Sequence, residues 1–582
     1  MGDLLRIDLT TRTTSEETIA PELIREYIGG KGIGTHLLFE EVGPEVDALS
    51  PQNKLIFVTG PINGTKMFGG NRFGVHFLSP LTDGYGECTC GGNLAPQFAK
   101  TGYKVVVVEG AAAEPVFLEI SESGATIHPA EGIWGRDAYE AEDLIKERVG
   151  VSRAKACAIG VAGENLVRFA CVNHDKWHQL GRGGPGAVMG SKKLKGLVFH
   201  GDKPVEVARP DEFQALVKEI ATASKDNPGV AAYKAKGTVQ MVRLLNGVNA
   251  FPTRYWRKGH LDDFEPLTAE TMIEKYLVKN EVCPPCFMQC VKHCKVPEGE
   301  PLAGLELDGP EYETIYVFGG LCEIVDFAQV MRMNDICDRL GIDTMCGGNL
   351  AALAIEASRR GLIDEKLDFG DADGVAEFLE HMCRRDTPTG DLFAEGVGAV
   401  EREIPQLKGI AVHVKGMAPA GYDPRSLKGM GLGYATTSRG ACHLRATFYK
   451  AELAGFIDPQ IIEGKAEMFV DWEDRLCIMD TLIYCRFYRD LVQWPYITAV
   501  VNAAIGTDYT PERLKAVANR IVTESHHFNE LRGFTTREHE KLPSWIMDRA
   551  TDDEKAYTLT QAEMDRMLSE YYELRGWGAP QL

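Results

Sequence analysis

Four cysteines lie close together in the middle of the chain. Cys283, Cys286 and Cys290 are separated by two and then three residues, and Cys294 follows three residues further on. Three thiolates at this spacing can converge on one soft-metal centre. Two prolines between the first two cysteines disfavour a regular helix, so the segment is expected to wrap around a ligand. The spacing therefore predicts an iron–sulfur or zinc site.

The two kinds of metal site imply different classes of protein. An iron–sulfur centre indicates an electron-transfer enzyme, whereas zinc indicates a structural module in a colourless, non-catalytic protein. The order C-x-x-C-x-x-x-C is the reverse of the C-x-x-x-C-x-x-C of radical enzymes that use S-adenosylmethionine, so that class is set aside. His293 and Lys292 flank the cysteines and either tune a cluster or are simply solvated.

Glycine-rich segments are more frequent in the first 200 residues than short strands require. They are GGKGIG at 29–34, FGGNRFG at 68–74, CTCGGN at 88–93 and GRGGPGAVMG at 181–190. Glycine lets backbone N–H groups approach a phosphate or a flat ring closely. None matches a P-loop or a dinucleotide-binding fingerprint. Two of them carry an arginine (Arg72, Arg182), which favours a large anionic cofactor.

Two aspartate-containing segments stand in the second half of the chain. DRLGID contains Asp338, Gly341, Ile342 and Asp343, and DTLIYC begins at Asp480. Asp338 and Asp480 could accept hydrogen bonds from a ligand rich in N–H donors, such as a pterin or a purine. The alternative is that each is a helix cap or a surface residue.

Composition limits the class of protein further. The 582 residues are 44% hydrophobic and carry a net charge of −21, with a pI of about 5.2. This charge argues against nucleic acid or an anionic membrane as a partner. No apolar run approaches the ~18 residues of a transmembrane helix, and the N-terminus does not read as a secretory signal. Fifteen scattered cysteines fit a reducing compartment, so a cytoplasmic protein is expected.

The secondary structure that must position these residues is expected to change from mainly strands to mainly helices along the chain. Short apolar runs bounded by Gly, Pro, Asn or Asp predict strands over the first 200 residues, including VRFACV at 167–172, with helices near 21–40 and 138–148. Helical spacing dominates afterwards. We predict an α+β protein with a β-rich cofactor-binding domain at 1–205, a helical domain at 206–410 and a second helical domain at 411–582.

Taken together, these motifs resemble the aldehyde:ferredoxin oxidoreductase family of tungsten enzymes. The resemblance runs from LLRIDLT and GGKGIGTHLL near the start to NELRGFTTREHEKLP near the end. It implies tungsten, with molybdenum as the alternative metal, held by two pterin cofactors beside one [4Fe–4S] cluster, with Mg²⁺ linking the pterin phosphates. It also implies that Cys283, Cys286, Cys290 and Cys485 ligate the cluster, leaving Cys294 as a spare or as a rival to Cys485 for the fourth position.

The resemblance assigns further residues by motif. Arg72 corresponds to an arginine that bridges cluster and pterin, and Asn93, Arg182 and Gly183 to loops around the phosphates and magnesium. DRLGID and DTLIYC correspond to two pterin-binding elements, although Ile483 stands where glycine is usual. Glu313 and His443 match the acid and imidazole that face the metal in aldehyde-oxidising members. Cys346 lies either near the metal or in the core as a small buried residue.

The implied reaction is oxidation of an aldehyde to a carboxylic acid. A carboxylate can take a proton from the attacking water, and an imidazole can hydrogen-bond the aldehyde oxygen. The metal would accept two electrons and the cluster pass them singly to ferredoxin or a small iron–sulfur subunit. Two alternatives stay open: the same cofactors catalysing another reaction, such as aryl-CoA ring reduction in a larger complex, and the non-catalytic zinc protein. Substrate, metal, redox partner and oligomeric state (homodimer or hetero-oligomer) are not determined by the motifs.

Overall fold

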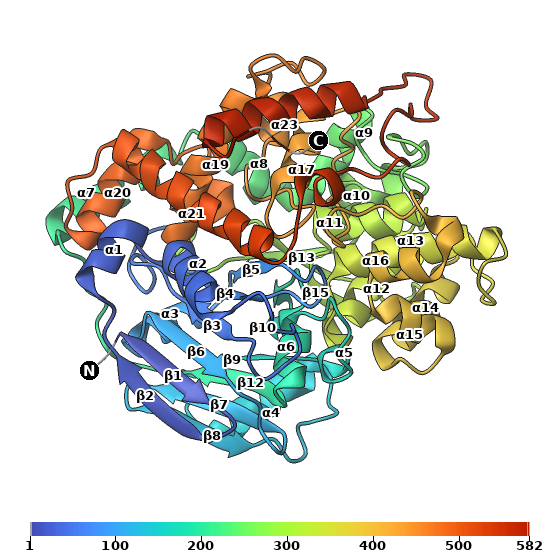
Figure 1. The fold of residues 1–582 in the computed structure, drawn as a ribbon. Coiled ribbons are helices and arrows are strands. Elements are labelled where there is room, and N and C mark those ends of the chain that lie inside the picture. Colours follow the sequence, from blue (N-terminus) through green and yellow to red (C-terminus); the bar gives the residue numbers. More distant parts are fainter. Residues whose placement is uncertain (1–2, 579, 581–582) are drawn as a thin grey trace.

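The computed structural model describes residues 3–578 and 580. It confirms the α+β prediction, with 43% of residues in helices and 14% in strands. Figure 1 shows the strands of the first third, in blue and cyan, below a larger helical region. Among the described residues, no helix is both long and apolar enough to cross a bilayer.

Two six-stranded sheets form the N-terminal region. The order of the first is β2 (Thr13–Glu17), β1 (Leu4–Asp8), β6 (Val105–Glu109), β3 (Leu55–Val58), β4 (Phe73–Leu78) and β5 (Tyr85–Cys90). The order of the second is β11 (His178–Leu180), β10 (Val172–His174), β9 (Lys155–Ala158), β12 (Leu194–Phe199), β7 (Val116–Ser121) and β8 (Gly124–Pro129). Only β1–β6 and β12–β7 pair in parallel among these strands.

The two sheets bury an apolar layer between them. Phe57 and Val106 of the first sheet belong to the same buried cluster as Leu118 and Leu197 of the second. The opposite face of the first sheet is covered by α2 (Gly30–Glu41) together with α19 (Lys465–Thr481), α20 (Trp494–Ile505) and α21 (Pro511–Leu531). Helices from the two ends of the chain therefore lie side by side (Figure 1).

The helical region is built on one continuous apolar cluster. Its main helices are α12 (Phe327–Leu340), α13 (Thr344–Arg359), α14 (Ala372–Arg384), α17 (Lys428–Thr436) and α23 (Gln561–Arg575). A small antiparallel sheet, β13 (Leu277–Glu281), β14 (Val291–Lys295) and β15 (Glu306–Asp308), lies at its border. This apolar cluster includes residues on both sides of position 410. The boundary between two helical domains at that position therefore stays a prediction.

Several local predictions were wrong in detail. The helix expected near 21–40 is two helices, α1 (Pro21–Tyr27) and α2, because Ile28 takes a φ of 67° between them. Of the strand expected at 167–172, only the last residue belongs to one, β10. The strand β2 was missed because its residues, TTSEE, are all exposed and show no apolar alternation.

The glycine content of GGKGIG suggested a loop, but most of this segment is helical. Residues 30–34 form the first turns of α2. A Cβ on Gly30, whose φ is +37°, would lie 2.7 Å from the carbonyl oxygens of Asp480 and Thr481. These glycines therefore permit a helix to lie directly on the chain that follows α19.

Candidate functional site

Four cysteines line one cavity of about 230 Å³. Cys283, Cys286 and Cys290 reach it from the irregular segment between β13 and β14, and Cys485 from the turn after α19. These four are partly exposed, whereas the other eleven of the fifteen cysteines are buried. Because buried thiols behave as small apolar side chains, partial exposure around a shared cavity distinguishes this set as candidate metal ligands.

The cysteines are held by hydrogen bonds from several segments. The Gly92 N–H lies 3.2 Å from the Cys283 sulfur, and the Cys485 N–H donates to the Gly69 carbonyl at 2.9 Å. Tyr488 Oη accepts from the Phe287 N–H at 3.4 Å and lies 3.3 Å from the Cys286 sulfur. Since the phenol already accepts a hydrogen bond, its own proton is available for that sulfur.

Cys294, the fourth cysteine in sequence, lies elsewhere. It is in β14, paired across the sheet with Leu277 and Leu307, and its side chain is fully buried in the helical core. It does not line the cavity that holds the other four. His293 beside it pairs with Asp308 at 2.8 Å.

Arg72 reaches the same cavity from the N-terminal region. Its guanidinium donates to the Thr89 carbonyl at 3.0 Å. A Cβ on Gly91 would lie 3.1 Å from the Cys283 sulfur and 3.2 Å from Arg72 Nη1, so the chain passes closely between these two side chains. A planar guanidinium at this position can donate to a sulfur and to a second group at once.

Glu313 and His443 are brought together from opposite parts of the helical region. Glu313 begins α11 (Tyr312–Ile315), and its Oε1 lies 3.5 Å from His443 Nε2. Its other oxygen accepts the Gly421 N–H at 3.0 Å. Glu313 Oε1 and His443 Nδ1 are buried and make no hydrogen bond to any described residue. Tyr422 stands against the imidazole, with ring centroids 5.5 Å apart.

Burial sets the protonation of this pair. It raises the pKa of Glu313 to about 8, although the Gly421 N–H and Arg182 act in the opposite direction. Burial also lowers the pKa of His443 well below its ordinary value, assisted by the charges of Arg182 and Arg439. At neutral pH the pair is therefore a carboxylic acid beside a neutral imidazole.

The first aspartate element joins the helical region to the second sheet. Asp338 is buried near the end of α12 and accepts hydrogen bonds from Gln179 Nε2 and Asn334 Nδ2, both at 2.7 Å. Burial raises the pKa of Asp338 well above its ordinary value. Gly341 ends the helix with a φ of +83°, and the Ile342 side chain enters the core.

Arg182 and Asp343 form a buried ion pair beside this element. Arg182 Nε lies 3.1 Å from Asp343 Oδ2, and the same carboxylate caps α13 through the Met345 N–H. Arg182 Nη2 lies 3.8 Å from the Cys346 sulfur, which is also buried. Gly183 follows with a φ of +83° in the turn that leads to α6 (Pro185–Ser191).

The second aspartate element ends in the same way as the first. Asp480 is buried near the end of α19 and accepts from Arg445 Nη1 at 2.9 Å and from Arg486 Nη2 at 2.5 Å. Ile483 has a φ of +50°, so it adopts the left-handed conformation that Gly341 has at the matching position. A β-branched residue rarely takes this conformation, which identifies a strained turn.

Buried positive charge exceeds buried negative charge around these elements. The cations are Lys31, Arg182, Arg439, Arg445 and Arg486, and the carboxylates are Glu87, Asp343 and Asp480. The carboxyl of Asp338 is also buried, but burial raises its pKa well above its ordinary value, so it is counted as neutral. The Nε atoms of Arg439, Arg445 and Arg486 have no hydrogen-bond partner among the described residues. Buried charges are normally paired, so five cations against three carboxylates, with free N–H groups, fit an anionic ligand such as a pterin dithiolene phosphate.

Arg439, Arg445 and Cys442 did not emerge from sequence reasoning. Arg439 Nη2 donates to the Cys442 sulfur at 2.7 Å. Burial would raise the pKa of Cys442, but Arg439, Arg445 and Arg182 outweigh it and lower the pKa to about 7. Arg439 and Cys442 lie within the SRGACH motif that contains His443, Arg445 follows that motif by two residues, and Arg486 directly follows Cys485. Their closeness in sequence to these motifs was the available signal.

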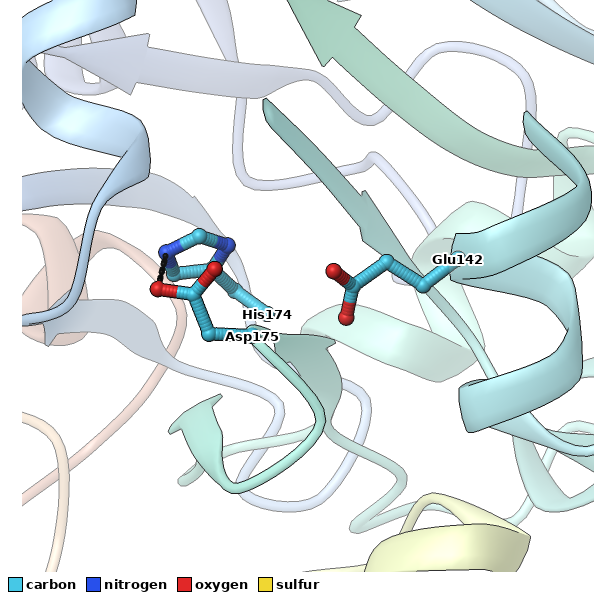
Figure 2. A group of neighbouring side chains, drawn as sticks. All are labelled: Glu142, His174 and Asp175. Atoms are coloured by element: carbon cyan, nitrogen blue, oxygen red, sulfur yellow. Dashed lines mark ion pairs between the residues drawn. The ribbon is translucent and has the colours of Figure 1, made fainter. Parts of the chain in front are cut away.

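Asn93 is held by a separate polar group, drawn in Figure 2. Asp175 Oδ2 accepts from both the backbone N–H and the side-chain Nδ2 of Asn93 at 2.8 Å and lies 2.9 Å from His174 Nε2. Glu142, the third member, accepts from Lys146 Nζ and the Lys176 N–H at 2.9 Å each. These hydrogen bonds show that the group anchors the Asn93 turn.

Comparison with known proteins identifies the class. Family models of the aldehyde ferredoxin oxidoreductase N-terminal domain and of its domains 2 and 3 match residues 4–201 and 215–581. The chain therefore belongs to the aldehyde ferredoxin oxidoreductase family, whose members are oxidoreductases.

Among its relatives is the tungsten-containing aldehyde ferredoxin oxidoreductase of Pyrococcus furiosus. It is 33% identical over 601 aligned residues, which cover 99% of this chain and 96% of that protein. The aliphatic sulfonate oxidoreductase, WOR-like subunit, of the same organism is 29% identical, covering 79% and 78%. The solved active site complex BamBC of benzoyl coenzyme A reductase shares the fold, with a TM-score of 0.84, 23% identity and coverage of 99% and 94%.

Proposed function

We propose that this protein oxidises an aldehyde to the carboxylic acid in a tungsten-dependent reaction and passes the electrons through a [4Fe–4S] cluster to ferredoxin or a small iron–sulfur subunit. The observation that carries the proposal is the buried pair of Glu313 and His443: Glu313 Oε1 lies 3.5 Å from His443 Nε2, and Glu313 Oε1 and His443 Nδ1 make no hydrogen bond to any described residue. A base and a hydrogen-bond donor at one point are what addition of water to a carbonyl requires.

The two residues have complementary tasks. In the balanced reaction, an aldehyde and water give a carboxylic acid, two electrons and two protons. Glu313 in its ionised form takes a proton from the attacking water. His443, kept neutral by burial, donates a hydrogen bond from its ring N–H to the carbonyl oxygen as negative charge develops there. The tungsten cofactor, when bound, accepts the electron pair, which no side chain can do.

The surrounding residues supply the cofactor sites. Cys283, Cys286, Cys290 and Cys485 would hold the cluster, with Arg72 beside it. The unpaired guanidinium groups, with Asp338 and Asp480, would recognise the two pterins through their N–H groups and anionic parts. Asn93 and Gly183 remain the proposed residues near the magnesium ion. We also propose a cytoplasmic location, since the cluster requires free thiols.

Metal analysis tests the cofactors first. Protein purified without oxygen is expected to contain about one tungsten and about four irons per chain. Zinc alone would support the structural module and overturn the proposal. Tungsten with iron is then followed by a panel of aldehydes with a viologen dye as acceptor. Full cofactor content without aldehyde turnover would point to a different reaction, such as reduction of an aryl-CoA ring.

A further inference from the structure

We propose that the edge of the small sheet formed by β13 is the docking surface of an acidic one-electron carrier protein. This inference rests on the proposed function, because it concerns the way electrons leave the cluster. The surface, called here the β13 edge, comprises Lys234, Lys275, Val278, Lys279 and Val282.

The β13 edge is next to the candidate cluster. The segment between β13 and β14 contains Cys283, Cys286 and Cys290, all partly exposed. Val282, the residue before Cys283, lines the cavity that the four cysteines share. A carrier seated on this edge would therefore approach the cluster through the hairpin that holds three of its four candidate ligands.

Charge on this edge is opposite in sign to that of the whole chain. At the surface of this edge, Lys234, Lys275 and Lys279 face two acids, Glu274 and Glu281, a local net charge of +1, whereas the chain carries −21. Lys279 pairs with Glu281 at 2.5 Å, and Lys292 of the hairpin is buried. Lys234 and Lys275 carry two exposed positive charges that form no ion pair within the described residues. Two exposed acids stand in α10 (Ala269–Lys275) beside this edge: Glu274, which precedes Lys275, and Glu270, which is paired with Lys236.

Hydrogen bonds fix Lys234 to the hairpin. Its carbonyl oxygen accepts from Asn280 Nδ2 at 3.1 Å and from the buried Lys292 Nζ at 2.8 Å. The end of α8 (Pro228–Lys236) and strand β13 thus form one continuous surface. An acidic protein would be repelled by most of this molecule and attracted here, which favours both orientation and encounter rate.

The β13 edge also has apolar contact area. Val278 and Val282 are 58% and 44% exposed. Val278 lies in β13, a strand paired on one side only, and Val282 directly follows its last residue, Glu281. The strand pairing is irregular between Leu277 and Lys279, which leaves Val278 outside the ladder. Exposed apolar residues within a charged rim are typical of transient protein interfaces.

Charge reversal at the edge tests the proposal. The triple variant Lys234→Glu/Lys275→Glu/Lys279→Glu is compared with Lys366→Glu/Lys408→Glu/Lys541→Glu, which makes the same charge change at exposed lysines outside the β13 edge. Both are prepared as anaerobic holoenzyme. Calorimetry measures binding of a purified acidic ferredoxin without aldehyde, and turnover is followed with ferredoxin and, separately, with a viologen dye.

We expect the edge variant to bind ferredoxin at least tenfold more weakly at low salt, with the difference shrinking as ionic strength rises. Its viologen-linked turnover and both properties of the control variant should be unchanged. If the edge variant and the control variant bind ferredoxin with the same affinity, whether that affinity is unchanged or reduced in both, the proposed docking surface is wrong. Failure of the proposed function appears differently, as absent viologen-linked aldehyde turnover in the unmodified protein, and the binding comparison still decides the docking surface.

Discussion

Glu313 Oε1 lies 3.5 Å from His443 Nε2, and neither Glu313 Oε1 nor the other imidazole nitrogen has a hydrogen-bond partner among the described residues. This arrangement leaves the carboxyl and the imidazole free to act on a substrate. It also gives the proposed chemistry a sharp test, because each group can be changed without altering a cysteine.

Replacement Glu313→Gln is expected to reduce aldehyde turnover by about 10²–10⁴-fold, since an amide cannot take a proton from water. The amide keeps the size of the side chain, and the cysteines are untouched, so tungsten and iron content should equal that of the unmodified protein. Normal turnover in this variant, with both metals present, would rule out Glu313 as the base.

The pH dependence of turnover should report the same carboxyl. Burial raises its pKa to about 8, so below this pH the base is protonated and inactive, and kcat/KM should increase as pH rises through about 8. Steady-state measurements from pH 6 to 10 with a saturating dye check this. A profile that is flat over this range would show that no group with this pKa limits the reaction.

Loss of a cluster ligand should be visible as loss of iron. Cys283→Ala and Cys485→Ala are each expected to lower iron well below four per chain, because both line the shared cavity. Cys294→Ala is the matched control: it removes a thiol from the same hairpin, but from a position in the core. Equal iron in all three variants would contradict the assignment of Cys283 and Cys485.

Tyr488→Phe should lower the reduction potential of the cluster. The phenol proton is directed to the Cys286 sulfur at 3.3 Å, and such a bond stabilises the more negative, reduced form. A potentiometric titration followed by electron paramagnetic resonance measures the midpoint. The ring and its packing remain, so an unchanged midpoint with full iron content would show that this hydrogen bond does not tune the cluster.

Ile483→Gly tests the strained turn after α19. Relief of the left-handed conformation would stabilise the protein by about 1–2 kcal/mol. Removal of a side chain that is 1% exposed costs more, about 2–5 kcal/mol, so a net loss of up to about 4 kcal/mol is expected. The midpoint of thermal unfolding should fall. A higher midpoint would show that strain outweighs packing at this position.

Sequence reasoning grouped the candidate site residues more accurately than it defined the helices and strands that carry them. The spacing of Cys283, Cys286 and Cys290 and the resemblance that added Cys485 selected four residues that the fold places around one cavity. The pairing of Glu313 with His443 also followed from motifs. These residues are recognisable because they occur in short segments whose residue types are rarely needed for packing alone.

The buried arginines could not be recognised in the same way. Arg445 contacts Asp480 and also Glu87 of β5, and Arg439 donates to the Glu87 carbonyl, so their roles depend on segments that are distant in sequence. A single buried charge has no periodicity, and its partner is known only once the fold is known. The polar strand β2 was missed for a related reason, because an edge strand exposed on all its residues lacks the alternation that reveals a strand.

The contact between α2 and the turn after α19 has a consequence for the order of biosynthesis. Gly30 and Gly60 lie against the backbone of residues 480–482, and α21 packs beside α2 on the same sheet. During translation, the N-terminal sheets and three of the four cysteines emerge long before Cys485 and α21. The cavity lined by the four cysteines can therefore be completed only when the last fifth of the chain has been synthesised. Until then the N-terminal sheets are open on this side, which gives an interval in which the proposed metal and organic cofactors can be inserted into a partly folded protein.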